Sequence, residues 1–218
     1  TKNKELMNKV KCFLIVFFLQ ITVCMFGATK DAMGIVHFLD GHEEQYEKIV
    51  LPYCNNKFIE VENGKEKKKI PFSEIDCLEV WHPKATKAES TNIYCTLETK
   101  KNGEVYPLWA FALAIGKHIS FYERCDGKFL IDKKYGASMK AVNFWVVYYK
   151  PSDPNNSHSV GRSENVFFGN KRSAVKRVLE VIKDDPVLYD SIDPEVWRKK
   201  MNEFFPYVAT SYKPNSYK

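Results

Sequence analysis

The stretch TNIYCTLETKKNGEVYPLWAF at 91–111 decides the fold of this chain. Residues 91–99 alternate between apolar and polar side chains, which is the pattern of a half-buried β-strand. The turn at Lys100-Lys101-Asn102-Gly103 follows, and 104–111 supplies a second strand of similar character. The stretch therefore predicts an antiparallel hairpin and, with its neighbours, a β-rich body.

The second strand of this hairpin carries alanine at every other position. If 108–115 is extended, Ala110, Ala112 and Ala114 share one face, and a neighbouring layer can approach that face closely. The same eight residues are also compatible with a short helix, because their spacing alone does not distinguish the two.

Similar hairpin signals occur on both sides of this stretch. Asp40-Gly41 predicts a two-residue hairpin turn, and Asn63-Gly64 predicts a second one, whose residues both tolerate the positive φ that a type I′ turn requires. Asp126-Gly127 predicts a further hairpin, with 119–124 paired to 128–131. The segment 141–149 is apolar on both faces, which is typical of a central strand covered on both sides.

The pattern changes after residue 150. Residues 151–170 are turn-rich and predict a linker or loop, whereas 171–206 shows helical spacing. Asp185-Pro186 and Asp193-Pro194 suit an N-cap carboxylate followed by proline in the first helical turn. We expect an α+β fold, in which an antiparallel sheet or partly open barrel at about 33–150 precedes C-terminal helices packed on it. In this division 29–150 is the β-rich domain and 207–218 is a tail.

The first 28 residues have the layout of a secretory signal peptide. A basic head at Met7–Lys11 precedes an apolar run at 12–26 and the small residues Gly27-Ala28. Met7 is an alternative start, and cleavage after Ala28 is the preferred interpretation. An uncleaved membrane anchor ranks second, and acylation of Cys24 ranks third because Val23 is bulky for that signal. The expected location is therefore secreted or periplasmic, with membrane contact only through an uncleaved leader.

The charge of the chain argues against a nucleic-acid partner. The formal net charge is +6, but the first 28 residues hold four lysines and one glutamate, so the remainder carries +3. That value is too mild to indicate a nucleic-acid surface, and an exported protein would rarely meet one. The expected partner is a protein or a glycan ligand.

Four cysteines follow the leader. An even number in an exported chain permits two disulfides with three pairings, and free buried thiols are an equally weighted alternative. No Cys-x-x-Cys pair is present, so the sequence supports neither a thioredoxin-type site nor a zinc ribbon. The candidate disulfide residues are Cys54, Cys77, Cys95 and Cys125.

The sequence predicts no catalytic, metal-binding or cofactor-binding residue. Histidines such as His37 and His42 flank a turn in positions that separate their rings, and the pair Asp184-Asp185 is explained by helix capping. The serines near the linker lack the frame of a nucleophile elbow, which is Gly-x-Ser-x-Gly. A secreted hydrolase would need carboxylates that converge only in the folded chain.

Aromatic residues make up 14% of the chain and favour a binding role. Aromatic side chains on a sheet stack against sugars or peptides, although for Trp109 and Trp145 a place in the core is the stronger interpretation. The candidate ligand-stacking residues are Tyr94, Tyr148 and Tyr149. The leading hypothesis is an exported, non-enzymatic protein that binds an envelope component or an extracellular ligand.

Three features together resemble a class of uncharacterised secreted or periplasmic bacterial proteins of the Bacteroidetes type. They are the leader, the segment KIPFSEIDCLEVW at 69–81, and the Asp-Pro pairs before the C-terminal helices. The resemblance covers a small fraction of the chain and implies export. Because that class carries no known activity, the resemblance assigns no role to any residue.

Overall fold

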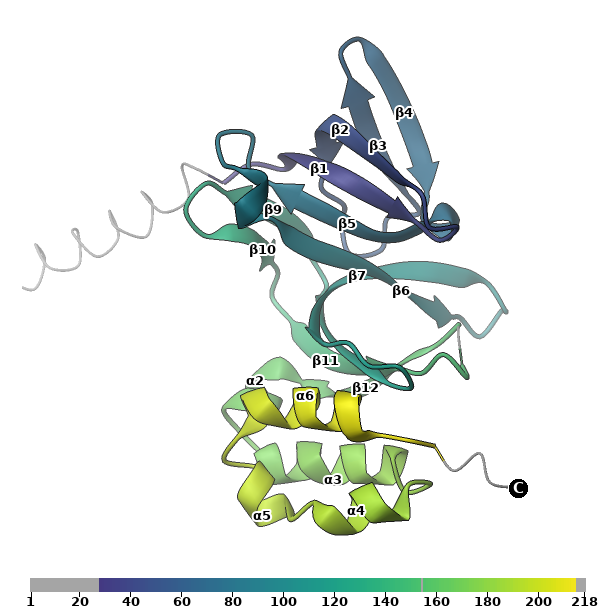
Figure 1. Cartoon of the computed structure of the whole chain (residues 1–218), viewed down its shortest axis with the longest axis vertical. Coiled ribbons are helices and arrows are strands. Elements are labelled where there is room, and N and C mark those ends of the chain that lie inside the picture. The colour runs from purple at the N-terminus through teal and green to yellow at the C-terminus, as the bar shows by residue number, and fades with distance from the viewer. Residues whose placement is uncertain (1–27, 154, 215–218) are drawn as a thin grey trace, which may run out of the picture.

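The fold is an α+β arrangement of one large antiparallel sheet followed by a layer of helices. A computed structural model describes residues 28–153 and 155–214 (Figure 1). The sheet has ten strands in the order β12-β11-β8-β7-β6-β5-β1-β2-β3-β4, and it remains open. In chain order these strands are β1 (Asp31–Phe38), β2 (Glu43–Val50), β3 (Phe58–Asn63), β4 (Glu66–Pro71), β5 (Ile75–Trp81), β6 (Thr91–Thr99), β7 (Val105–Ala114), β8 (Ser120–Cys125), β11 (Phe144–Tyr149) and β12 (Ser157–Arg162).

Three of the predicted hairpins are confirmed. β1 pairs with β2, β3 with β4, and β6 with β7, each in antiparallel register. The turn glycines Gly41, Gly64 and Gly103 have φ values of 89°, 59° and 82°, which is the conformation that favours glycine. The predicted type I′ geometry is wrong, because it needs a positive φ at both central residues and no described residue other than glycine has one. Asn63 pairs with Glu66, so that turn is Gly64-Lys65, and the Phe38 N–H donates to the His42 carbonyl, so the first loop has three residues.

The alanine-rich segment is part of strand β7, so the extended interpretation is confirmed. The prediction that all three alanines share one face is wrong, because a bulge between Ala112 and Ala114 turns Ala114 toward the helices.

The hairpin predicted around Asp126-Gly127 is wrong. β8 pairs with β7 and β11 of the large sheet, whereas β9 (Lys128–Asp132) pairs with β10 (Gly136–Lys140) in a separate two-stranded sheet. The chain leaves the large sheet at this bend because the Asp126 carboxylate accepts hydrogen bonds from the backbone N–H groups of Val142 and Asn143. Phe129 and Ile131 of β9 then cover the core beneath β1–β6.

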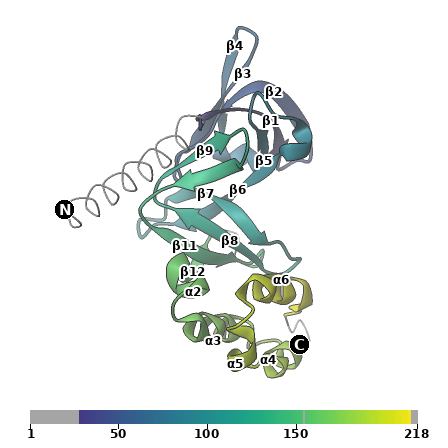
Figure 2. The same ribbon diagram turned by 90° about the vertical axis from the view of Figure 1, so that its left-hand side faces the viewer.

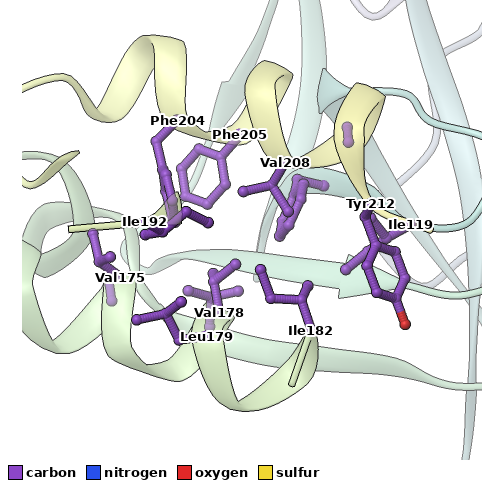
Figure 3. Packing of buried hydrophobic residues seen from close by; sticks show 14 of the residues in the cluster. Ile119, Val175, Val178, Leu179, Ile182, Ile192, Phe204, Phe205, Val208 and Tyr212 are labelled. Carbon is purple, nitrogen blue, oxygen red and sulfur yellow. The ribbon is translucent and has the colours of Figure 1, made fainter. Parts of the chain in front are cut away.

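Five α-helices of the described residues pack on the face of the sheet formed by β7, β8, β11 and β12 (Figure 2). They are α2 (Ser163–Phe167), α3 (Lys171–Val181), α4 (Pro186–Ser191), α5 (Pro194–Trp197) and α6 (Met201–Ser211). Figure 3 shows their core, in which α3 contributes Val175, Val178 and Leu179, and α6 contributes Phe204, Phe205 and Val208. Each amphipathic helix is too short to be stable alone, so burial of this apolar face is what stabilises it.

The predicted helix caps are confirmed. The Asp185 side chain accepts a hydrogen bond from the Leu188 backbone N–H at 3.1 Å. The Asp193 side chain accepts one from the Glu195 N–H at 2.8 Å. In both helices proline occupies the first turn, where its missing N–H leaves no helical bond unmade.

Two predicted boundaries differ from the structure. The range 151–170 is not a plain linker, since it holds strand β12 and helix α2. The helix expected to end at Pro206 continues to Ser211. Pro206 lies on the exposed side of α6, and burial of Phe205 and Val208 on the other side outweighs the one lost backbone hydrogen bond.

The predicted signal peptide lies almost wholly outside the described residues. Of the helices within residues 28–153 and 155–214, none combines the length and apolar character that crossing a bilayer requires.

Candidate functional site

The candidate site lies on the face of the sheet opposite the helices, where the strands β6, β7, β8 and β11 curl (Figure 1). The alternation of β7 places Ala110 and Ala112 on this face. Tyr94 pairs with Ala110 across β6–β7, and Tyr122 pairs with Ala112 across β7–β8. The small alanine side chains between the two tyrosines leave space in front of the strand.

The two tyrosines line a pocket with a volume of about 400 Å³. Tyr94, Tyr122 and Tyr149 line it, together with the polar residues Asp76, Thr96 and Asn155. Apolar side chains complete the lining, including Leu39, Phe72 and Leu97. The volume lies within the usual range for small-ligand pockets.

The pocket forms because β6 is longer than its pairing with β5. That pairing begins at Val80–Thr91 and ends at Cys77–Tyr94, which leaves 95–99 without a partner on that side. The turn between β11 and β12 approaches the free end instead: the Thr99 N–H donates to the Asn156 side chain at 3.2 Å, and the Thr99 hydroxyl donates to the Asn155 carbonyl at 3.1 Å. The pocket thus lies between the start of β5 and this turn.

Two tyrosine rings form a corner of the pocket. The ring centroids of Tyr94 and Tyr122 are 5.8 Å apart, and their planes are inclined by 57°. Tyr94 and Tyr149 are half exposed, whereas only 8% of the Tyr122 surface is accessible to solvent. The structure therefore offers ring faces on two sides of one small volume.

Only two of the three predicted stacking residues meet here. Tyr94 and Tyr149 line the pocket, but Tyr148 lies on the opposite face of β11. There it packs against the helical core and stacks on His158, with centroids 5.1 Å apart. The third tyrosine of the pocket, Tyr122, is not among the predicted residues, because the sequence does not show which face of the sheet the helices leave open.

The carboxylate of Asp76 reaches the pocket through a β-bulge. His37 pairs with Cys77 and Phe38 pairs with Ile75, so Asp76 is the extra residue of β5. Such a bulge re-aims a side chain that regular alternation would direct elsewhere. Asp76 is exposed to solvent while lining the pocket, and regular spacing gave no signal for it.

Burial keeps the pocket hydroxyl and thiol groups protonated. Burial raises the pKa of Tyr122 to about 12, and the nearby Tyr94, Asp76 and Tyr149 act in the same direction. Burial also raises the pKa of Tyr149, with a smaller contribution from the Asp153 carboxylate. Burial, reinforced by Asp76, raises the pKa of Cys95 to about 12, so this thiol is a poor nucleophile near neutral pH.

The described lining of the pocket carries one formal charge, that of Asp76, and includes no Lys, Arg or His. Arg124 lies on the same sheet face but interacts with groups outside the pocket lining. Its guanidinium contacts the Glu98 carboxylate at 2.7 Å and lies 6.0 Å from the Trp145 ring. The pocket is therefore aromatic and mildly acidic.

The histidines do not form a second site. His37 contacts Glu43 at 2.9 Å, and His158 contacts Asp153 at 2.8 Å, each within the exposed part of the sheet. Among residues 28–153 and 155–214, no three His, Cys, Asp or Glu residues come close enough together to hold a metal ion. The four predicted disulfide residues Cys54, Cys77, Cys95 and Cys125 are all free thiols in this structure.

Comparison with known proteins adds no evidence on function to that of the pocket. No family model, curated protein or solved structure matches this chain.

Proposed function

We propose that this chain is an exported, non-enzymatic binding protein whose ligand places a positively charged group in the tyrosine pocket. The observation that carries the proposal is the convergence of Tyr94, Tyr122 and Tyr149 on one volume together with the Asp76 carboxylate. The leader at 1–28 supports export. The ligand is then an extracellular or envelope component that presents an ammonium or guanidinium group.

The choice of a cation follows from the chemistry of the lining. The face of a tyrosine ring is electron-rich and attracts a cation, by about 0.5–1 kcal/mol at an exposed site and about 2 kcal/mol when water is excluded. Asp76 adds an attraction that salt weakens. Since the described lining holds no positive side chain, nothing opposes entry of a cation.

A protein ligand that presents a lysine or arginine side chain fits this pocket better than a neutral glycan. Sugars also stack on tyrosine and can donate hydroxyl hydrogen bonds to a carboxylate, but only a cation gains both the attraction of the ring faces and the charge attraction of Asp76. The pocket opens between β5 and the β11–β12 turn, so a side chain can enter from solvent while its own backbone stays outside.

The test uses ring signals of the tyrosines, measured by NMR on protein with ¹³C-labelled tyrosine. Choline is the cationic probe, and 3,3-dimethylbutanol is its neutral isostere. We expect choline to shift the Tyr94, Tyr122 and Tyr149 signals with a Kd on the order of 1 mM, and the isostere to bind much more weakly. Tyr53 and Tyr135, exposed elsewhere at 56% and 67%, serve as internal controls.

Two variants make the test sharper. Tyr94→Ala should abolish the choline shifts, whereas Tyr135→Ala should leave them unchanged. Equal binding of choline and its isostere, or a stronger response to a neutral oligosaccharide such as maltose, would contradict the cationic ligand. Turnover of a secreted-hydrolase substrate that is lost in Asp76→Asn would instead support the enzymatic alternative.

A further inference from the structure

We propose that Cys54 and Cys125 form a disulfide bond once the protein reaches an oxidising compartment. Three pairings of two disulfides are open from the sequence, and the structure brings only these two of the four thiols to one place among the residues it describes. This inference is independent of the tyrosine pocket.

The segment around Cys54 runs antiparallel to the bend that follows β8. Tyr53 forms a β-bridge with Lys128, and the Cys54 N–H donates to the Gly127 carbonyl at 2.9 Å. The Phe129 N–H donates to the Pro52 carbonyl at 3.2 Å. Cys54 is therefore opposite Gly127, two residues from Cys125.

The sheet holds Cys125 at the same place from the other side. Ala110 pairs with Arg124, so the next residue of β8, Cys125, is beside Trp109 of β7. The Trp109 N–H donates to the Cys54 carbonyl at 2.8 Å. Both cysteines are thus immediate neighbours of the Trp109 backbone. Diagonal neighbours of this kind are about 7–8 Å apart, so the bond requires the bend at 125–128 to move by about 1 Å toward Cys54.

The electrostatics agree with this proximity. Burial raises the pKa of the Cys125 thiol to about 11, and the neighbouring Cys54 thiol contributes to the increase. The Cys125 Sγ accepts a hydrogen bond from the Gly127 N–H at 3.4 Å, which places the sulfur inside the bend that Cys54 contacts.

The other two cysteines do not fit a bond with each other or with this pair. Cys77 is opposite Tyr94 across β5–β6, so its side chain and that of the next residue, Cys95, lie on opposite faces of the sheet. Cys95 pairs with Trp109 of β7, which separates it from Cys125 by two strand spacings, or about 9.6 Å. That distance exceeds the Cα separation that a disulfide tolerates.

The reaction requires an external oxidant. The two thiols lose two protons and two electrons as the S–S bond forms, and a low-molecular-weight disulfide such as oxidised glutathione takes them up to become two thiols. Because burial raises the pKa of both thiols, the exchange should be slow at neutral pH and faster at pH 8–9.

The test compares the full-length chain before and after treatment with oxidised glutathione at pH 8.5. Digestion without reduction, followed by mass spectrometry, should yield one peptide pair joined through Cys54 and Cys125. The other four cysteines of the full-length chain, which are Cys12, Cys24, Cys77 and Cys95, should remain open to alkylation in urea. A bond between any other pair, or six alkylatable thiols after oxidation, would overturn the inference.

Two variants separate a specific bond from a loss of folding. Cys54→Ser should remove the linked peptide pair, and the double variant Cys77→Ser/Cys95→Ser should keep it. The oxidised wild-type chain should melt about 5–15 °C above the reduced one, because the bond closes a long loop of the unfolded chain. That difference should vanish in Cys54→Ser, whose circular dichroism spectrum should still match that of the reduced wild type.

Discussion

The rings of Tyr94 and Tyr122 are 5.8 Å apart, although their strands β6 and β8 are separated by β7. The contact is possible because Ala110 and Ala112 of the intervening strand are small. The two small residues of β7 therefore let the tyrosines of its two neighbouring strands form one corner of the pocket.

Neutralising Asp76 should weaken cation binding and remove much of its dependence on salt. Asp76→Asn keeps the size of the side chain and removes its charge, and an exposed ion pair contributes about 0.2–1 kcal/mol. We expect choline affinity to fall about threefold in 20 mM salt and to become nearly equal to that of the wild type in 500 mM salt, as measured by NMR titration.

The matched control for this change is Glu66→Gln, at the far end of the β3–β4 hairpin. It removes one exposed carboxylate without touching the pocket, so affinity should stay within error of the wild type. If both variants lose the same choline affinity, the loss comes from the change in net charge of the protein. Asp76 then does not contact the ligand.

Ionisation of Tyr122 should destabilise the fold at alkaline pH. Its pKa is about 12 in the folded chain, against 10.0 for a free tyrosine, so its contribution is complete below pH 10 and is lost as pH rises toward 12. At pH 11 the loss amounts to about 1.4 kcal/mol. Tyr122→Phe should therefore lose less free energy of unfolding between pH 9 and 11 than the wild type, as measured by urea denaturation.

Other tyrosines and lysines titrate in the same range, so the comparison depends on a control. Tyr135→Phe removes an exposed hydroxyl and should reproduce the wild-type pH profile. If the free energy of unfolding falls equally with pH in Tyr122→Phe and in the wild type, ionisation of the Tyr122 hydroxyl does not destabilise the fold.

The local elements of the fold could be predicted because their signals are local. Asp40-Gly41 and Asn63-Gly64 each require a positive φ at one glycine, and the structure has it. Asp185 and Asp193 each cap the helix that the following proline begins. These turns and caps depend on neighbouring residues alone, so they can be predicted without knowing which distant residues they contact.

The remaining differences have a non-local cause. Strand β12 has few apolar residues, and it is extended because it pairs with β11 and buries Val160 beneath the helices. Tyr148 and Tyr149 alternate across β11, and the helical layer alone decides which of them faces the pocket. Asp76 enters the pocket through a bulge, which the alternation of β5 could not show.

Removing the Tyr212 hydroxyl should lower the stability of the fold at the C-terminal end of the helical layer. The Lys150 ammonium donates to the Val181 carbonyl at 2.8 Å and to the Tyr212 oxygen at 2.7 Å. The Tyr212 hydroxyl in turn donates to the Asp184 carboxylate at 2.8 Å. Because Tyr212 is 2% exposed, Tyr212→Phe leaves these charged groups without their shared partner, and we expect a cost of about 1–3 kcal/mol.

This loss should appear as a fall in Tm of several degrees, measured by circular dichroism. Tyr189→Phe, on the half-exposed side of α4, is the matched control and should change Tm little. A Tm unchanged in Tyr212→Phe would mean that water replaces the hydroxyl at no cost.

Gly116 sets the distance between the sheet and α6, and replacing it should disrupt that contact. A Cβ atom at this position would lie 2.0 Å from the Ala209 carbonyl oxygen and 2.6 Å from that of Ile119. Both neighbours are backbone atoms, so relief requires α6 or the β7–β8 connection to move. We expect Gly116→Ala to cost more than 3 kcal/mol, roughly the scale of a large core defect, in urea denaturation.

A glycine that needs only its backbone conformation provides the comparison. At Gly103 a Cβ atom would meet nothing within 4 Å, but φ is +82°, so Gly103→Ala should cost about 1 kcal/mol from backbone strain alone. Hydrogen exchange separates the two effects, because Gly116→Ala should remove protection from the amides of α6 while Gly103→Ala should not. Equal costs for the two variants, with α6 protected in both, would mean that the close approach at Ala209 does not determine how the helices are held on the sheet.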